Sequence, residues 1–358
     1  MNLSKSGTAV STAAVRRSLT LALALMTTLL TAGAKAEEPS TALINRDAIV
    51  YCAAVGKVYA VDKAHGAVVA VSAAGVSKSL KTGSDPVAIA VNNRTSAVYV
   101  VNGGDHSVSI IDGKTDTLVA TVTTAARPYA IAVDEVGNKI YVSNIFSDEL
   151  NVIDGVTNTV SSLKIGSYDA IVVDAPRRQI YLLGYEGDRL TLLNVDTNAL
   201  EKIPAGATHL WGIALTANKL YVTHVQDSTI AAIDTGTHAV KNLQVGAMPS
   251  AVAANPLTGE VYVANYNDGS VTILNGDAPT AIVVGKHPQA IAIDATKKLV
   301  YVANTQDGTV SVIDAQTHHV LRTVSAGQHP YAIAVNAKTH TVYVANLSGT
   351  PFTALGND

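Results

Sequence analysis

Residues 299–335 read LVYVANTQDGTVSVIDAQTHHVLRTVSAGQHPYAIAV, and most of the chain between residues 48 and 346 repeats this stretch. Apolar and polar residues alternate in four short runs, which predicts half-buried strands over Val300–Ala303, Val310–Ile313, Val320–Val324 and Ala332–Val335. Turn chemistry separates the runs. Asp307-Gly308 suits a tight hairpin turn, and Pro330 cannot donate to a strand ladder. The stretch therefore predicts an all-β repeat unit of four strands.

The tyrosine of the first run recurs with spacings between 39 and 42 residues, at Tyr99, Tyr141, Tyr181, Tyr221, Tyr262, Tyr301 and Tyr343. A longer gap of 48 residues separates Tyr99 from Tyr51, which begins a degenerate copy of the repeat. A period near 40 with four strands per unit is typical of a β-propeller, in which each unit forms one blade. The run that opens each blade occurs seven times, at Val87, Tyr129, Asp169, Trp211, Ser250, Gln289 and Tyr331. Seven inner strands predict seven blades.

The two ends of the repeat array indicate how the ring closes. After Tyr343 the chain supplies little more than one further run, while the N-terminal part begins with the strand-like segments AIVYC and KVYAVD. We expect these N-terminal strands to complete the last blade, because such pairing removes free sheet edges. The predicted fold is a seven-bladed β-propeller of four-stranded antiparallel blades, closed by N-terminal strands.

The strand motif carries a family resemblance. It reads YVVN at Tyr99, YVSN at Tyr141 and YVAN at Tyr262, Tyr301 and Tyr343, followed by SVID or NVID and then G-x-x-P. With this pattern the chain resembles the YVTN family of β-propeller repeat proteins, which includes periplasmic seven-bladed propellers of the YncE type. The resemblance implies an exported or surface protein and does not imply one activity, since propellers host binding, scaffolding and catalysis.

Residues 1–36 have the pattern of a signal peptide. Arg16-Arg17 forms the positive region, Leu19–Leu30 the apolar core, and Ala34–Ala36 a small-residue cleavage site. We therefore expect a signal peptide over 1–36, a single propeller domain over 37–358, and a periplasmic or secreted protein without a transmembrane segment. The paired arginines also fit a twin-arginine signal, but Ser18-Leu19-Thr20 lacks the expected aromatic residue, which favours the general secretory route.

Charge and cysteine content limit the possible partners. Removing the signal peptide takes four basic residues from the 25 in the chain and leaves 21 against 28 acidic residues, a net charge of about −7. An acidic total opposes general tracking along phosphate backbones. Cys52 is the only cysteine, so no intramolecular disulfide can form. We expect a monomer.

The loops that enter each inner strand converge on the mouth of the central channel, and their residues vary from blade to blade. Before the proline or its equivalent stand Asp85, Arg127, Ser167, His209, Met248, His287 and His329. A regular array does not need such variety, so a ligand site is expected here. The predicted ligand-binding residues are Arg127, Tyr129, Asp169, His209, Trp211, His287, His329 and Tyr331.

Three interpretations of this mouth remain open. His209, His287 and His329, with Asp85 or Asp169, are candidate ligands for a divalent metal, the one cofactor that the residues suggest, if their nitrogens meet within a few ångströms. Trp211, Tyr129 and Tyr331 with Arg127 could stack on a planar ligand or on single-stranded nucleic acid. Alternatively, these residues line the channel while a partner protein binds elsewhere.

Recurring polar residues have a simpler explanation. One set ends the third run, Asp112, Asp154, Asp234 and Asp314, with Asn194 and Asn275 in two blades. A second set ends the second run, Asn102, Asn144, Asn265, Asn304 and Asn346. Repetition in most blades indicates that both sets stabilise turns.

The function therefore has to be inferred from the residues at the mouth of the central channel. No nucleophile elbow, phosphate loop, zinc spacing or dinucleotide fingerprint is present. We predict an exported binding or scaffold protein that holds a small ligand or a partner protein. The alternatives are a metal-dependent hydrolase or lyase with a histidine cluster at the mouth, by analogy with enzymatic propellers, and a single-stranded nucleic-acid-binding protein.

Overall fold

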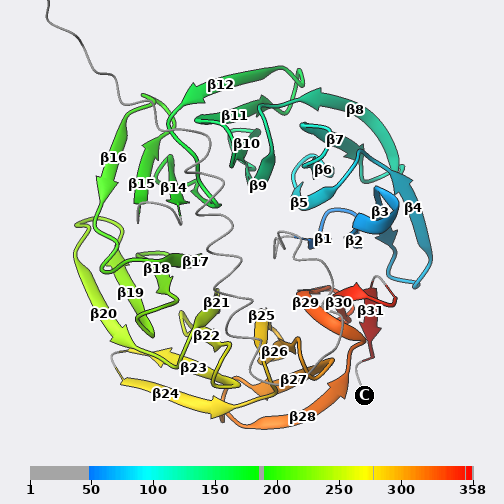
Figure 1. The fold of residues 1–358 in the computed structure, drawn as a ribbon. Coiled ribbons are helices and arrows are strands. Elements are labelled where there is room, and N and C mark those ends of the chain that lie inside the picture. The colour runs from blue at the N-terminus through cyan, green and yellow to red at the C-terminus, as the bar shows by residue number, and fades with distance from the viewer. Residues whose placement is uncertain (1–47, 185–188, 277, 351, 357–358) are drawn as a thin grey trace, which may run out of the picture. The chain divides into compact units, whose positions relative to one another are not determined.

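The computed structural model describes residues 48–356 except 185–188, 277 and 351. The predicted signal peptide lies outside these residues. The described chain forms eight antiparallel sheets, each built from strands consecutive in sequence and hydrogen-bonded in that order. Figure 1 shows the sheets arranged as blades around a central axis. The all-β propeller architecture is thus confirmed.

The strands of each blade are numbered from the channel outward. The first, innermost strands are β1 (Ile49–Cys52), β5 (Pro86–Asn92), β9 (Pro128–Asp134), β13 (Ala170–Asp174), β17 (Leu210–Leu215), β21 (Pro249–Ala254), β25 (Pro288–Asp294) and β29 (Gln328–Val335). The second strands are β2 (Lys57–Asp62), β6 (Ala97–Asn102), β10 (Lys139–Asn144), β14 (Gln179–Gly184), β18 (Lys219–His224), β22 (Val261–Asn265), β26 (Leu299–Asn304) and β30 (Val342–Ser348).

The remaining strands complete the blades toward the outside. The third strands are β3 (Ala67–Val71), β7 (Ser107–Asp112), β11 (Glu149–Asp154), β15 (Arg189–Asn194), β19 (Thr229–Asp234), β23 (Ser270–Asn275), β27 (Thr309–Asp314) and β31 (Phe352–Leu355). The fourth are β4 (Ser77–Lys81), β8 (Thr117–Thr123), β12 (Val160–Lys164), β16 (Leu200–Ile203), β20 (Val240–Gln244), β24 (Ala278–Val283) and β28 (Val320–Ser325). One 3₁₀ turn, η1 (Lys63–His65), follows β2. No helix within the described residues is long and apolar enough to cross a membrane.

Burial follows strand position. In the second strand β6, every residue after Ala97 is buried, whereas the outer strand β8 of the same blade is mainly exposed. A second strand lies between two neighbouring blades and is covered on both faces. Its sequence is therefore almost continuously apolar, as in AVYVVN, and does not alternate. The core of the protein consists of the layers between blades.

The prediction of seven blades is wrong, because the structure has eight. The sequence interpretation aligned Tyr51 with the repeat tyrosines, which left an unusually long gap to Tyr99. In the structure Tyr51 belongs to the inner strand β1, and Tyr59 in β2 occupies the repeat position, 40 residues before Tyr99. Strand β1 lacks the proline that marks most inner strands, so the first blade was counted as part of the last.

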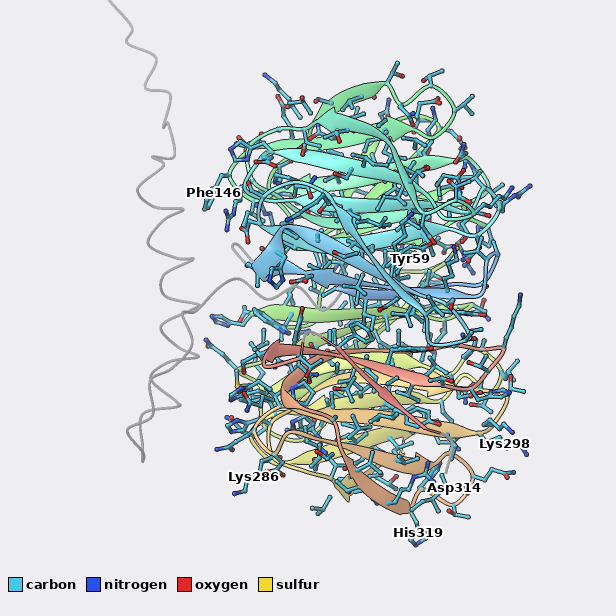
Figure 2. The ribbon with its side chains drawn as sticks, turned by 90° about the vertical axis from the view of Figure 1, so that its right-hand side faces the viewer. Tyr59, Phe146, Lys286, Lys298, Asp314 and His319 are labelled. Atoms are coloured by element: carbon cyan, nitrogen blue, oxygen red, sulfur yellow. The ribbon has the colours of Figure 1, made fainter. Side chains whose placement is uncertain are left out.

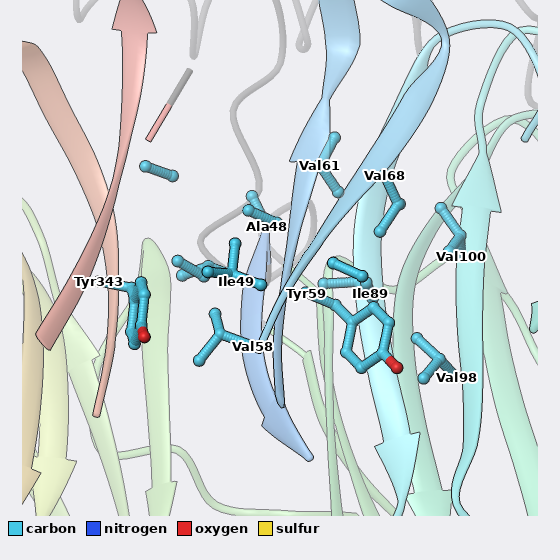
Figure 3. Close-up of a cluster of buried hydrophobic side chains, with 14 of the residues drawn as sticks. Ala48, Ile49, Val58, Tyr59, Val61, Val68, Ile89, Val98, Val100 and Tyr343 are labelled. Atoms are coloured by element: carbon cyan, nitrogen blue, oxygen red, sulfur yellow. The ribbon is translucent and has the colours of Figure 1, made fainter. Parts of the chain in front are cut away.

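The predicted closure by strand exchange is also wrong within the described residues. Strands β1–β4 form a complete blade, while the last blade contains β29, β30 and β31. The two blades meet by side-chain packing, and β1 contacts both β5 and β29. Residues from both ends of the chain, including Ile49, Val58, Tyr331 and Tyr343, share one buried cluster, hereafter the closing cluster (Figure 3). Hydrophobic burial therefore closes the ring.

The two faces of the ring carry different loops. Figure 2 places Phe146, which follows a second strand, and Lys286, which follows a fourth strand, on one side. We call this side the mouth face. Lys298 and Asp314, in the loops after a first and a third strand, lie on the other side, the opposite face. Loops after second and fourth strands therefore share the mouth face.

Substitution of Tyr343 by Ala tests the closing cluster. Tyr343 is 3% exposed, and removing a buried aromatic ring costs about 3–5 kcal/mol. We expect this loss in the free energy of unfolding, measured by urea denaturation. The control Val156→Ala removes a side chain that is 80% exposed and should change stability by no more than about 0.5 kcal/mol. Equal midpoints for the two variants would show that the first and last blades do not support each other.

Candidate functional site at the channel mouth

The loops that enter the inner strands share an uncommon backbone conformation. Six of the variable residues on the mouth face have left-handed φ angles between 51° and 59°, namely Asp85, Arg127, His209, Met248, His287 and His329. At the remaining position, Ser167, the preceding Gly166 takes the positive φ instead. A left-handed conformation is rare for residues other than glycine, but His, Asp and Asn adopt it more readily.

A recurring hydrogen bond holds this conformation. The carbonyl of Asp85 accepts from the backbone N–H of Gly103 at 2.8 Å, and that of Arg127 accepts from Ile145 at 3.0 Å. The carbonyls of His209, Met248 and His287 accept equivalent bonds at 3.0–3.1 Å from Val225, Tyr266 and Thr305. The backbone is thus nearly constant while the side chain is free to vary.

This conformation explains much of the histidine usage. Of the ten histidines in the chain, seven have positive φ angles: His106, His209, His238, His287, His318, His329 and His340. Their recurrence at turns reflects a backbone preference. Histidine at the mouth is therefore weaker support for a metal site than the sequence suggested.

In two blades the asparagine that ends the second strand fixes the mouth loop. Asn304 accepts from the backbone N–H of Gly285 at 3.1 Å and donates to the hydroxyls of Thr309 and Ser311 at 3.1 and 2.9 Å. Asn102 makes the same three bonds in its blade. Nearby, Asp307 accepts from the N–H of Lys286 at 2.8 Å, so the carboxylate caps the same loop. The predicted structural role is confirmed for Asn102 and Asn304, whereas Oδ1 of the other three repeat asparagines accepts no hydrogen bond from the described residues.

The third-strand carboxylates have the predicted turn role as well. Asp314 accepts from the N–H groups of Gln316 and Thr317 at 2.7 and 2.8 Å, and these bonds lower the pKa of its carboxyl group. Asp154 and Asp234 make equivalent contacts with the turns that follow them. These residues lie on the opposite face and belong to turns.

One side of the mouth carries an ion cluster that links three blades. The carboxylate of Asp85 lies 2.8 Å from Nζ of Lys63 and 3.3 Å from Nη2 of Arg127. Arg127 also donates its backbone N–H to Nδ1 of His106 at 3.1 Å. The three charged side chains are partly exposed, so solvent screening keeps their contribution to stability small. These three side chains together carry one net positive charge.

Another side carries stacked rings. The rings of Tyr266 and His287 lie 4.2 Å apart at an interplanar angle of 12°. Burial lowers the pKa of His287, and the positive charge of Lys286 acts in the same direction, while Asp307 opposes it. A neutral imidazole stacked on a phenol is a flat, apolar platform. Sequence reasoning missed Tyr266, although its place directly after a YVAN run could have assigned it to the mouth face.

The other predicted site residues have different surroundings. Tyr129, Asp169, His209 and Trp211 are half-buried, and His329 is exposed, with Nδ1 at 3.1 Å from the hydroxyl of Ser348. Tyr331 is only 8% exposed and belongs to the closing cluster, where burial raises its pKa to about 12. Its side chain is therefore part of the core.

The structure does not assemble the candidate metal ligands. Among the described residues, no three His, Cys, Asp or Glu side chains lie close enough together to hold a metal ion. His209, His287 and His329 come from blades five, seven and eight, and they do not form such a group. A metal centre made of these three histidines does not fit this geometry.

His224 is a buried histidine that the sequence interpretation did not single out. It replaces the asparagine at the end of the second strand, as YVTH shows, and is fully buried. Its ring nitrogens lie 2.8 Å from the hydroxyl of Thr229 and 2.8 Å from the carbonyl of Ala205. His224 thus tethers the mouth loop of its blade, as asparagine does elsewhere.

Comparison with known proteins supports the fold alone. The chain matches the computationally designed Ika8 protein with a TM-score of 0.70 at 16% identity, covering 87% of this chain and 97% of that one. It matches Kuenenia stuttgartiensis hydrazine synthase at 0.62 and 16%, covering 75% and 95%. It matches virginiamycin B lyase from Staphylococcus aureus at 0.60 and 12%, covering 73% and 93%. No family model matches the chain, and no curated protein matches it.

Substitution of Asn304 by Ala tests the loop tether. Asn304 is fully buried, and its loss leaves the Gly285 N–H and two hydroxyls without their partner. Since each unsatisfied buried group costs about 1–3 kcal/mol, we expect urea denaturation to show a loss of roughly 2–4 kcal/mol. Asn267→Ala, at an exposed position two residues beyond the same motif in another blade, is the control and should be nearly neutral. Similar stabilities for both variants would contradict a tethering role.

The lowered pKa of His287 predicts a pH dependence. Because the folded protein binds a proton at His287 less readily than the unfolded chain, this residue favours folding above its ordinary pKa of about 6.5. That contribution decreases as the pH falls through this value. We expect the wild type to lose more stability than His287→Asn between pH 7.5 and pH 5. Asparagine keeps the left-handed backbone accessible and does not titrate. Parallel pH profiles, or an NMR midpoint for His287 at or above 6.5, would contradict the expectation.

Proposed function

We propose that this protein is an exported binding module whose mouth face docks a partner protein. The observation that supports this most strongly is that a nearly constant left-handed backbone presents four types of side chain, Asp, Arg, His and Met, in six blades. A scaffold that holds backbone geometry fixed and varies side chains is suited to recognition. The signal-peptide pattern of residues 1–36 supports export to the periplasm or the medium.

The distribution of mouth residues favours a protein over a small ligand. Arg127 and Tyr129 lie in the third blade, Trp211 in the fifth, and His287 in the seventh, so they surround the channel. A protein surface is broad enough to contact residues from three different blades, and Trp, Tyr and Arg are the residue types most enriched at binding hot spots.

A photo-crosslinking experiment tests this proposal. The crosslinking amino acid p-benzoylphenylalanine replaces Trp211 on the mouth face or, as a control, Leu257, which is 74% exposed in the loop between β21 and β22 on the opposite face. We expect a discrete adduct in the producing cell from position 211 and none from position 257. An adduct restricted to position 257 would place the binding surface elsewhere.

The captured partner then permits a quantitative test. Trp211 is the only tryptophan, so its fluorescence reports directly on the mouth face. Purified partner should change this fluorescence in the wild type. Isothermal titration calorimetry, which does not depend on the tryptophan, should show that Trp211→Ala weakens binding by about 30-fold, as for a hot spot worth about 2 kcal/mol. Leu257→Ala should bind within about twofold of wild type. Unchanged affinity in Trp211→Ala would overturn the proposal.

A further inference from the structure

A pocket of about 210 Å³ lies between the second and third blades, bordered by turns of the opposite face. It is lined by Thr95, Ala97, Tyr99, Ile110, Ile111, Asp112, Lys114, Val119, Gly155 and Asn158. The walls are aliphatic, while the polar groups gather at the two turns that follow third strands. The pocket is independent of the mouth face and of the function proposed for it.

The neighbouring interface, between the first and second blades, shows how the same space can be filled. There Nζ of Lys57 donates to the carbonyl of Gly113 at 3.0 Å and to the carboxylate of Asp116 at 2.6 Å. The hydroxyl of Tyr59 donates to the same two residues at 3.1 and 2.8 Å. A lysine side chain thus lies between the blades with its ammonium group bound by a turn.

The repeat relates each of these groups to one in the pocket. Ala97 stands where the first blade has Lys57, since each lies two residues before the repeat tyrosine. Tyr99 corresponds to Tyr59. In the adjoining turn, Gly155 corresponds to Gly113 and Asn158 to Asp116. All four pocket counterparts line the cavity, which exists because alanine cannot reach the turn.

Tyr99 lacks the hydrogen bonds that Tyr59 makes. Its side chain is 1% exposed and lines the pocket, and within the described part of the chain its hydroxyl makes no hydrogen bond like those of Tyr59. Burial and the nearby carboxylate of Asp154 raise its pKa to about 12, so the hydroxyl stays protonated. The oxygen of this neutral hydroxyl can accept a hydrogen bond from an ammonium group in the pocket.

The charges around the pocket nearly balance. Asp112 contributes a carboxylate and Lys114 an ammonium group to the lining. Beyond Asn158, the carboxylate of Asp154 is already paired with Lys139 at 2.6 Å. In the first interface the carboxylate of Asp116 binds the ammonium group of Lys57. At the corresponding position Asn158 offers a neutral amide oxygen. The pocket should therefore bind a cation more weakly than Asp116 binds Lys57.

We propose that this pocket binds a primary alkylammonium group on a short aliphatic stem, either a free amine or the lysine side chain of a peptide. The stem replaces the missing carbons of Lys57 along Ala97, Ile110 and Val119. The ammonium group donates to the Gly155 carbonyl and to the amide oxygen of Asn158. Binding strength for a ligand of about five heavy atoms is expected in the millimolar range.

Titrations with n-butylammonium and with N-acetyl-lysine-N-methylamide, followed by NMR, test the proposal and separate the two sources. We expect saturable shifts at Ala97, Tyr99 and Asn158 with at least one probe. Binding of butylammonium alone indicates a free amine, and binding of the lysine derivative indicates a peptide. n-Butanol, which lacks the charge, should bind more weakly. No saturable shift with either amine, or equal binding of butanol, overturns the proposal.

Three variants give matched controls. Ala97→Lys places an internal ammonium group in the pocket and should abolish binding of both probes. Asn158→Asp restores the carboxylate of the first interface and should tighten binding about tenfold, since charge-assisted hydrogen bonds are stronger. Lys57→Ala should create a second butylammonium site beside Gly113 and Asp116. Unchanged binding in both Ala97→Lys and Asn158→Asp would show that the probes bind elsewhere.

Discussion

Burial of the second strand on both faces is the constraint on which the rest of the structure depends. A run such as AVYVVN in β6 is covered only when a blade packs on each side of it. No blade can provide this cover alone, so blades must stack, and a row of stacked blades leaves apolar faces at its two ends. Closing the ring removes both exposed faces at once, which is what the closing cluster accomplishes.

Closure by packing differs from closure by strand exchange in what it demands of the chain ends. Here the first blade is complete in itself, and the last presents Tyr331 and Tyr343 to it. The contact between them is another layer of the kind found between all other blades. The ring therefore needs no special closing strand among the described residues, only two ends whose faces match.

The period, the four-strand unit and the turn roles of Asp314 and Asn304 could be predicted, because each is repeated and each repetition adds to a weak local signal. The number of blades could not. Strand β1 lacks the usual proline, and Tyr51 resembles the repeat tyrosine although Tyr59 occupies that position. A single irregular copy carries no repetition to correct the alignment.

The same reasoning explains the outcome at the candidate site. Variation from blade to blade identified the mouth loops, and the structure shows why they tolerate variation. Their backbone is held by a recurring backbone hydrogen bond and, in two blades, also by Asn102 and Asn304. The surroundings of individual side chains were not predictable. Tyr331 is buried because it adjoins the first blade, a contact between the chain ends that no local pattern encodes. Histidine at the mouth suggested metal, whereas its left-handed backbone accounts for its presence.

In a repeat protein each position can be compared with the equivalent position in the other blades. A residue that departs from the repeat is therefore informative about the chemistry at its position. The position two residues before the repeat tyrosine holds Lys57, Ala97, Lys139, Gln179, Lys219, Glu260, Leu299 and Thr341 in successive blades. Lys57 reaches the next blade's turn, and Glu260 contacts His318 there at 3.1 Å. Ala97 has the smallest side chain of the eight. Because its neighbours keep the tyrosine, the glycine and a polar turn residue, the space that it leaves is lined by the counterparts of the groups that bind Lys57 in the first interface.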